Sequence, residues 1–220
     1  MVLPQGRVER DRPEQNRKAA VVREGEGMIE TNKIYNMDCL DGMKQTYNVL
    51  YVDPPWNYNN KRTGGSMKSG ASQQYDILDE DGIVNIIRNI PTTESSVIFL
   101  WSTTPMIKSA LSILEKLGFT YKTQIVWIKT GRLGMGFWVR VQTEFLLLGV
   151  KGKVAPFRSS MRNFVMEKPG KHSVKPIQFY DIIEKLTAEM PDRKMIEIFA
   201  RNTKLGWDSF GNELEIIEEN

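Results

Sequence analysis

The chain has 220 residues and a formal net charge of +3. Of these residues 40% are hydrophobic and 26% are charged, which is typical of a globular protein with a substantial core. One cysteine and one histidine exclude an internal disulfide and a cysteine-rich zinc site, and they disfavour zinc hydrolase chemistry. The N-terminal stretch lacks a signal peptide's apolar segment and no apolar run could span a bilayer, so we expect a cytoplasmic protein without membrane contact.

Residues 1–28 mix charged residues with Gly, Pro and Gln and contain few large apolar residues, which predicts a disordered or loosely attached arm. A short strand is expected at 32–36, followed by a turn and a short helix at 38–43. A buried strand is expected at 49–52, where four apolar or aromatic residues stand in a row.

That strand ends at a stiff corner, Asp53-Pro54-Pro55-Trp56. Proline cannot donate to a sheet ladder and restricts the residue before it, so neither strand nor helix continues here. In open α/β sheets, ligands bind at the carboxyl ends of strands. A carboxylate, a carbonyl and a flat aromatic at this place suit the binding of a planar base by its exocyclic amine.

Residues 59–72 are rich in Gly and Ser and carry three basic side chains, which predicts a loop that contacts substrate. Asp79 is suited to cap a helix that runs to about Asn89. A central strand is expected at 96–101, and a helix at 105–117 with Gly118 as its stop.

Strands and helices alternate through the rest of the chain, which predicts an α/β fold with a mostly parallel sheet and helices on both of its faces. We expect a single domain at 29–214 and an acidic tail at 215–220. The remaining expected elements are strands at 120–129, 142–150 and 195–199, a glycine-rich loop at 130–138, a basic loop at 151–175, and a helix from Pro176 to about Glu189.

Six segments together resemble one known family: YVDPPW, VIFLW, QIVWIKT, TEFLLLGVKG, KPIQFYDIIEKL and MIEIFARNTKLGWDSFGNEL. They resemble the MT-A family of adenine amino-methyltransferases. That family includes the catalytic subunit of the mRNA adenosine methyltransferase and many bacterial and phage DNA adenine methyltransferases. The resemblance covers residues 33–214, and the motifs stand in the family's order.

The resemblance implies a Rossmann-like class I methyltransferase fold with S-adenosylmethionine as methyl donor. The corner matches the family's catalytic motif, with Asp53, Pro54, Pro55 and Trp56 as catalytic residues. An exocyclic base amine is a poor nucleophile because its lone pair is delocalised into the ring. If the Asp53 carboxylate and the Pro54 carbonyl accept its two N–H groups, the nitrogen becomes more electron-rich. Trp56 would stack on the base.

The resemblance also implies two sets of binding residues. The expected cofactor-binding residues are Asp38, Cys39, Asp53, Lys175, Glu197, Phe199, Arg201, Asn212 and Glu213. The expected substrate-binding residues are Trp56, Tyr58, Tyr75, Lys61, Arg62 and Lys129. Two positions depart from related patterns. The Phe-x-Gly-x-Gly run of many methyltransferases is here Phe199-Ala200-Arg201-Asn202, and Thr203 stands where some members have histidine.

Several residues also have structural interpretations. For His172, orienting Lys175 or contacting phosphate is favoured over catalysis, because it is a lone histidine in a basic polar loop with no acid or nucleophile partner. For Cys39, packing beside the cofactor is favoured over a nucleophilic role. Trp101, Trp127 and Trp207 are expected in the core, with a share in base binding left open for Trp127. For the basic loop 151–175, phosphate contacts are favoured over a solvated face.

We therefore expect an N6-adenine methyltransferase that acts on a flipped or unpaired adenine of DNA. RNA is the alternative acceptor, and a catalytically silent nucleic-acid-binding subunit of a methyltransferase pair is the alternative of another class. Cytosine or protein glutamine methylation is a further alternative that more often uses a corner beginning with Asn or Ser. A homodimer and a partner methyltransferase subunit are both left open, and loops 59–74, 130–138 and 151–174 are the expected source of specificity.

Overall fold

The structure is a computed structural model that describes residues 34–35, 45–57, 78–131, 138–170, 174–201 and 203–211, with residues 34–35 described by their backbone alone. The predicted arm at 1–28, the helix at 38–43, the loop at 59–72 and the tail at 215–220 lie outside these residues. Among the described residues, no helix is long and apolar enough to cross a membrane.

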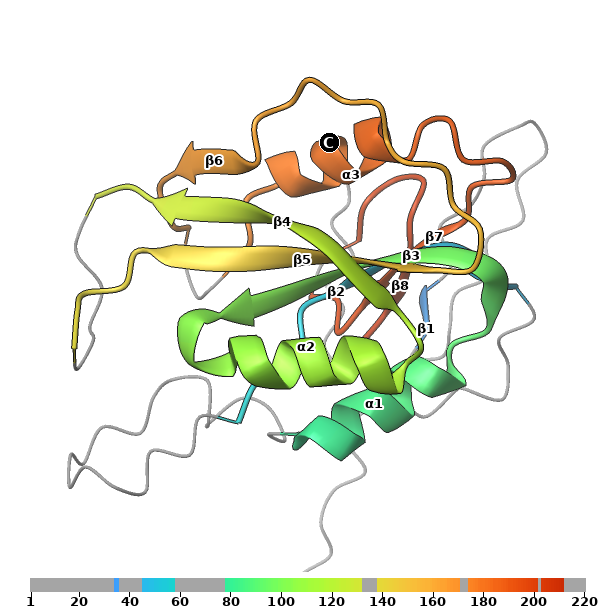
Figure 1. The fold of residues 1–220 in the computed structure, drawn as a ribbon, viewed down its shortest axis with the longest axis horizontal. Coiled ribbons are helices and arrows are strands. Elements are labelled where there is room, and N and C mark those ends of the chain that lie inside the picture. The colour runs from blue at the N-terminus through green and yellow to red at the C-terminus, as the bar shows by residue number, and fades with distance from the viewer. Residues whose placement is uncertain are drawn as a thin grey trace, which may run out of the picture.

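The fold is built on an eight-stranded sheet with the order β1-β8-β7-β2-β3-β5-β4-β6 (Figure 1). β5 runs antiparallel to its neighbours β3 and β4, and the other pairs are parallel, which confirms the expected α/β fold with a mostly parallel sheet. The strands are β1 (Ile34–Tyr35), β2 (Tyr47–Val52), β3 (Thr92–Thr103), β4 (Thr120–Lys129), β5 (Thr143–Lys151), β6 (Phe164–Glu167), β7 (Met195–Ile198) and β8 (Asp208–Phe210).

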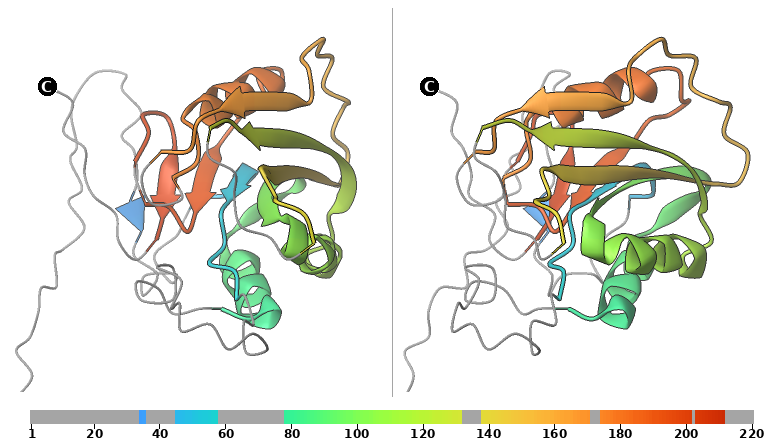
Figure 2. Two further views of the ribbon diagram at one scale, coloured as in Figure 1. Left: turned by 90° about the vertical axis from the view of Figure 1, so that its left-hand side faces the viewer. Right: turned by 60° about the vertical axis from the view of Figure 1, so that its left-hand side comes forward.

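Helices cover both faces of the sheet, as expected. The helices α1 (Glu80–Asn89) and α2 (Ile107–Lys116) lie on one face, and α3 (Gln178–Leu186) lies on the other (Figures 1 and 2). Alternate residues of each strand therefore enter two separate cores. Leu50 and Val52 of β2 pack with α1 and α2, whereas Val49 and Tyr51 pack with α3.

Local signals explain several element boundaries. The Asp79 carboxylate accepts a hydrogen bond from the Gly82 N–H at 2.8 Å and begins α1 as predicted. Pro105 lies in a 3-10 turn, η3 (Thr104–Met106), that leads into α2. Gly118 then adopts φ +80°, a left-handed conformation that ends the helix where the sequence places its stop.

The outer strands and the last helix differ from expectation. The strand predicted at 120–129 is confirmed, but β6 lies inside the segment predicted as a basic loop, and β8 was not predicted. The buried face of α3 is formed by Phe179 and Ile183, whereas Ile177 is 70% exposed because the helix begins only after it. Helical spacing alone therefore misplaced the first turn of this helix.

Candidate active site

Asp53 lies directly after β2, at the edge of the sheet where the parallel strands end. Its backbone N–H approaches the Ile198 carbonyl at 3.4 Å, so the corner sits beside the end of β7. Pro54 is buried and Pro55 half-buried, which fixes the backbone that carries the carboxylate. The corner thus presents a half-buried acid from a rigid turn.

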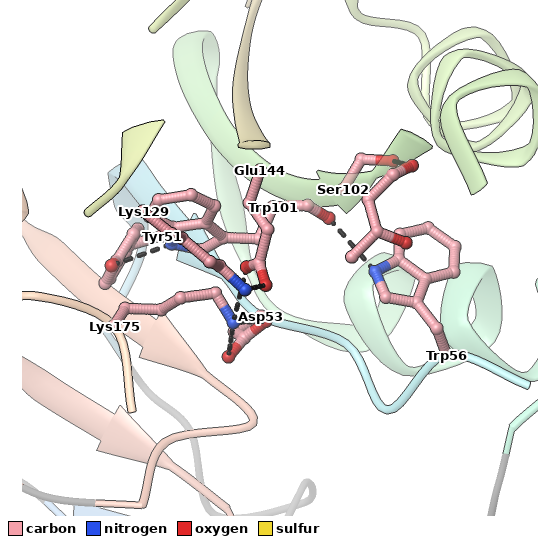
Figure 3. A network of polar contacts seen from close by, with 9 residues as sticks. Tyr51, Asp53, Trp56, Trp101, Ser102, Lys129, Glu144 and Lys175 are labelled. Carbon is pink, nitrogen blue, oxygen red and sulfur yellow. Dashed lines mark hydrogen bonds and ion pairs between the residues drawn. The ribbon is translucent and has the colours of Figure 1, made fainter. Parts of the chain in front are cut away.

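A chain of alternating charges crosses this edge (Figure 3). The Lys175 ammonium donates to both oxygens of Asp53, at 2.8 and 2.7 Å. The same ammonium lies 3.5 Å from the Glu144 Oε2 atom. The other oxygen of Glu144, Oε1, accepts a hydrogen bond from Lys129. We call these four residues the edge charge chain: Asp53, Lys175, Glu144 and Lys129.

The reversal of β5 explains how distant residues reach one edge. Because β5 is antiparallel to β3, its first residues lie beside the last residues of β3, and Glu144 pairs with Thr103. Glu144 also pairs with Trp127 of β4, two residues before Lys129. The amino end of β5 and the carboxyl ends of β2, β3 and β4 therefore meet.

The ammonium of Lys175 has aromatic as well as acidic surroundings. It lies 5.2 Å from the centre of the Trp101 ring, a favourable distance for a cation–π contact. The indole N–H of Trp101 donates to the Tyr51 hydroxyl at 2.8 Å, which fixes the ring. Burial alone would lower the pKa of Lys175, but the carboxylates of Asp53 and Glu144 outweigh it and raise the pKa, so the ammonium stays charged.

A second carboxyl group lies in the neighbouring strand. Glu197 of β7 is 8% exposed and accepts a hydrogen bond from the Tyr180 hydroxyl at 2.5 Å. Burial, with the nearby charge of Asp53, raises the pKa of Glu197 to about 8 despite this hydrogen bond. Burial and the Glu197 charge likewise raise the pKa of the Tyr180 and Tyr51 hydroxyls. This part of the site therefore favours neutral groups.

The chain turns sharply where β7 ends. Phe199 adopts φ +64°, a left-handed conformation that is uncommon for a bulky residue and typical of functional sites. The next N–H, of Ala200, donates to the Phe210 carbonyl at 3.0 Å. A Cβ at Gly211 would lie 2.2 Å from the Ala200 carbonyl oxygen, so β8 can end against this turn only with glycine there.

The structure brings together the predicted site residues that it describes. Asp53 and Lys175 are in direct contact, and Glu197 is close enough to feel the charge of Asp53. Arg201 is half-buried, and its charge acts on Lys175 and Glu197. The other predicted residues lie outside the described part of the chain: Asp38, Cys39, Tyr58, Lys61, Arg62, Tyr75, His172, Asn212 and Glu213.

Trp56, which was expected to stack on the base, lies in the core instead. Trp56 is 8% exposed, packs in the core below the corner and donates its indole N–H to the Trp101 carbonyl at 3.2 Å (Figure 3). In this position its ring holds the corner against β3. Trp127 is also buried, and its indole N–H donates to the Glu167 carbonyl at 3.0 Å. Trp101 and Trp207 lie in the core as expected.

Glu144 belongs to the site but was not among the predicted residues. It stands one residue inside the strand Thr143–Lys151, whose other members are apolar, glycine, threonine or the terminal lysine. An acid at the head of an otherwise apolar buried strand was the available signal. That signal could be read only if the strand were known to run antiparallel. Lys129 was predicted to bind substrate, but in this structure its ammonium binds Glu144.

This arrangement can position a small polar group rather than attack one. It offers a carboxylate on a rigid turn, a charged ammonium, and a half-buried acid with a second oxygen close to that ammonium. Such a set can accept hydrogen bonds from an amine and can hold an anionic group by its cations.

The MT-A70 family matches residues 47–213 of this chain. The type II methyltransferase M.MunI of Mycoplasma sp is 32% identical over 193 residues, which cover 78% of this chain and 79% of that protein. A putative N(6)-adenosine-methyltransferase MT-A70-like protein of Medicago truncatula is 29% identical over 178 residues, and human N(6)-adenosine-methyltransferase catalytic subunit METTL3 is 26% identical over 181 residues. These matches cover 76% and 77% of this chain but only 26% and 28% of the two relatives.

The Asp53-Pro54-Pro55-Trp56 corner, the edge charge chain and the turn at Phe199 all fall within the matched range, and the mostly parallel α/β sheet is consistent with a Rossmann-like methyltransferase fold. The chain belongs to the MT-A70 family of S-adenosylmethionine-dependent N6-adenine methyltransferases.

Proposed function

We propose that this protein methylates the N6 amine of adenine in DNA, with Asp53 and the Pro54 carbonyl as acceptors for the two amine hydrogens. The observation that supports this best is the Asp53 carboxylate at the carboxyl edge of the sheet, on a turn fixed by two prolines and by the packed ring of Trp56. Positioning of this kind supplies much of the rate when two reactants must meet in line.

The residues that follow β7, together with Lys175 and Asp53, fit S-adenosylmethionine. The charged groups of this cofactor are a sulfonium, an ammonium and a carboxylate. Lys175 and Arg201 would hold its carboxylate, and the Phe199 ring and the Asp53 carboxylate would face its cationic groups. Asp38, Cys39, Glu197, Asn212 and Glu213 complete the proposed cofactor site. When bound, the cofactor supplies an electrophilic methyl group.

An amine that binds at Asp53 would share the carboxylate with the Lys175 ammonium or replace that ammonium, because each carboxylate oxygen can accept two hydrogen bonds. Both oxygens of Asp53 are occupied by the Lys175 ammonium, at 2.8 and 2.7 Å. Glu144 lies 3.5 Å from the same ammonium and is itself held by Lys129. Glu144 therefore gives the ammonium a second partner, so that Asp53 can turn to the amine without leaving a buried cation unpaired.

DNA is proposed as the acceptor from the extent of the similarities. The type II methyltransferase M.MunI is matched over 79% of its length, whereas human METTL3 is matched over 28%. RNA is the second candidate, since the adenosine methyltransferases share the same matched region. Tyr58, Lys61, Arg62 and Tyr75 are the residues that we propose to contact the acceptor near the corner, with a homodimer or a partner subunit as the assembly.

The test is a methylation assay on unmethylated DNA and RNA, with quantification of N6-methyladenine nucleosides by mass spectrometry. We expect methylated deoxyadenosine with the wild type and a loss of at least about 10²-fold with Asp53→Asn, which keeps the shape but removes the charge. Asp81→Asn, an exposed acid on α1, is the matched control and should leave the rate unchanged. Methyladenosine in RNA alone would assign RNA as the acceptor.

Two outcomes would contradict the proposal. Full activity of Asp53→Asn would remove the carboxylate from the mechanism. Absence of methyladenine in every nucleic acid, with a folded protein that binds the cofactor, would support the silent-subunit alternative.

A further inference from the structure

The outermost strand, β6, carries a row of exposed side chains that no part of the proposed active site uses. Phe164 is 37% exposed and Met166 is 60% exposed, and they alternate with Val165, which packs into the core beside α3. Arg162 and Lys168 flank the strand on either side and are exposed. We call these four residues the β6 stripe: Arg162, Phe164, Met166 and Lys168.

In the described part of the chain, the sheet next to the β6 stripe lies outside the core that α1 and α2 cover. Phe164 pairs with Val126 of β4 and Met166 pairs with Ile128, so these four apolar side chains share one face. On that face, α1 and α2 pack on β2, β3, β5 and β7, and the described residues of β4 and β6 do not join that core. Val126 and Ile128 are accordingly only half-buried.

The charge of this surface has one sign. The described residues of β4 and β6 include a single acid, Glu167, which lies on the opposite face and accepts a hydrogen bond from Gln178 of α3 at 2.7 Å. The Arg162 guanidinium lies 5.9 Å from the centre of the Phe164 ring. A cation beside an exposed ring, flanked by a second cation, is suited to a ligand that carries phosphates and flat bases.

The β6 stripe ends at the same edge of the sheet as the edge charge chain but lies on the opposite face, because Lys129 pairs with Glu167. Glu167, the last residue of β6, pairs with Lys129 of the edge charge chain, so Lys168 lies at the catalytic edge of the sheet. From Lys168 the stripe runs away from that edge along the four residues of β6 and on to Arg162. A chain that entered the active site could therefore pass over this edge and continue along β6.

We propose that the β6 stripe binds unpaired nucleotides of the acceptor strand beside the target adenine, with Arg162 and Lys168 on phosphates and Phe164 stacked on a base. This inference rests on the proposed function, since it takes the acceptor to be a nucleic acid. A duplex would bury its bases against each other and leave the ring and Met166 without partners, so the surface fits a single-stranded segment.

A second copy of this chain fits the same surface less well. Pairing of two β6 edges in antiparallel fashion about Val165 would place Arg162 of each copy opposite Lys168 of the other. Like charges directly opposite each other destabilise a strand pair. The positive charge of the β6 stripe thus favours an anionic strand over a copy of itself.

The test is fluorescence anisotropy with a labelled single-stranded oligonucleotide of about 16 nucleotides, without cofactor. We expect Phe164→Ala to weaken binding roughly five- to a hundredfold, because stacking needs the ring. Phe164→Tyr keeps an aromatic ring and should bind like the wild type. Phe164→Leu, which keeps the apolar bulk, should bind as weakly as the alanine variant. Tyr121→Ala removes an aromatic that is 41% exposed at the other end of β4 and should bind normally.

The proposed phosphate contacts of Arg162 and Lys168 are tested by the salt dependence of binding. The double variant Arg162→Ala/Lys168→Ala should reduce the slope of log affinity against log salt by about 1.4, or 0.7 for each phosphate contact on a single strand. Lys122→Ala/Lys185→Ala removes two exposed cations elsewhere and should leave the slope unchanged. An equal change with both pairs would show that only net charge matters and would overturn the proposal.

Three other results would also overturn it: normal single-strand binding by Phe164→Ala, an equal loss on duplex DNA, or a wild-type dimer in sedimentation that Phe164→Ala dissociates. The binding assay needs no methyl transfer, so it separates the two proposals. Ring-dependent binding without any methylation would leave the β6 stripe standing and the proposed function refuted. Methylation together with binding that does not depend on the Phe164 ring would support the proposed function and overturn the proposal for the β6 stripe.

Discussion

Two lysines in this protein each bridge two carboxylates, but in different surroundings. Lys116 of α2 lies 2.8 Å from both Glu80 and Asp81, and its side chain is 42% exposed. Lys175 lies 2.7 Å from Asp53 and 3.5 Å from Glu144, and its side chain is 13% exposed.

The contrast shows that geometry alone does not give an ion pair its importance. Exposed pairs contribute little because water and salt screen them, whereas a half-buried pair that loses one partner leaves a charge in a poorly solvated place. The ion pairs of Lys116 join two surface helices, α1 and α2. The edge charge chain lies at the candidate site, and its four side chains are half-buried.

The largest effect is expected from removal of the buried cation. Lys175→Met leaves Asp53 and Glu144 close together without their common partner, and we expect the free energy of unfolding to fall by about 2–4 kcal/mol. Lys116→Met is the matched control and should change it little, because its partners remain in water. Urea unfolding of the variants at neutral pH measures the difference, and equal losses would contradict the comparison.

A second substitution should restore part of that loss. Glu144→Gln in the Lys175→Met background removes one of the two like charges that then face each other without Lys175 between them, so the double variant should be more stable than Lys175→Met by about 1–2 kcal/mol. Glu80→Gln in the Lys116→Met background should produce no comparable recovery. Additive effects in the first cycle would show that Glu144 and Lys175 are not coupled, contrary to the 3.5 Å contact.

The pH dependence of stability should separate buried from exposed acids. Burial raises the pKa of Glu197 to about 8, so between about pH 5 and 8 the folded state holds a proton that the unfolded chain has lost. Stability therefore falls as pH rises through this range, and Glu197→Gln should flatten that fall. Hydrogen bonding to Lys204 lowers the pKa of Asp181, so the stability that this acid adds is constant between pH 5 and 8 and is lost only at more acidic pH. Asp181→Asn should therefore keep the wild-type slope. Unfolding curves at pH 5, 6, 7 and 8 test this, and an unchanged slope in Glu197→Gln would refute it.

The smallest effect is expected from salt. Any stability difference between the wild type and Lys116→Met should vanish between about 0.05 and 1 M salt, because the screening length falls to about 3 Å. The difference for Lys175→Met should persist, since its partners are shielded from solvent. Urea unfolding at both salt concentrations distinguishes the two lysines, and parallel salt responses would contradict the contrast.

Local signals predicted much of the fold. The cap at Asp79 and the stop at Gly118 act within one turn of chain, so sequence sufficed to locate the ends of α1 and α2. β6 and β8 were missed because they are short and pair with strands that are distant in the sequence, β6 with β4 and β8 with β1. No local pattern reports such a pairing, and the basic residues around β6 favoured a loop.

The candidate site was predictable where it depends on a strand end, and not where it depends on strand direction. Asp53 follows from the rule that ligands bind beyond the carboxyl ends of parallel strands. Glu144 sits at an amino end and reaches the same edge only because β5 is reversed. The burial of Trp56 depends on Leu78, which bridges to it from a distant part of the chain, and on the Trp101 carbonyl.

The reversal of β5 has a consequence for how such a protein can diversify. Because β4 and β5 are antiparallel neighbours, the connection between Lys129 and Thr143 begins and ends at the same edge of the sheet as Asp53. Doubling the length of a flexible connection costs only about 0.6 kcal/mol in closure entropy. Insertions in this connection can therefore change the rim of the candidate active site while the sheet and helices stay unchanged. This connection is accordingly a suitable position for designed insertions that aim to change which acceptor is bound.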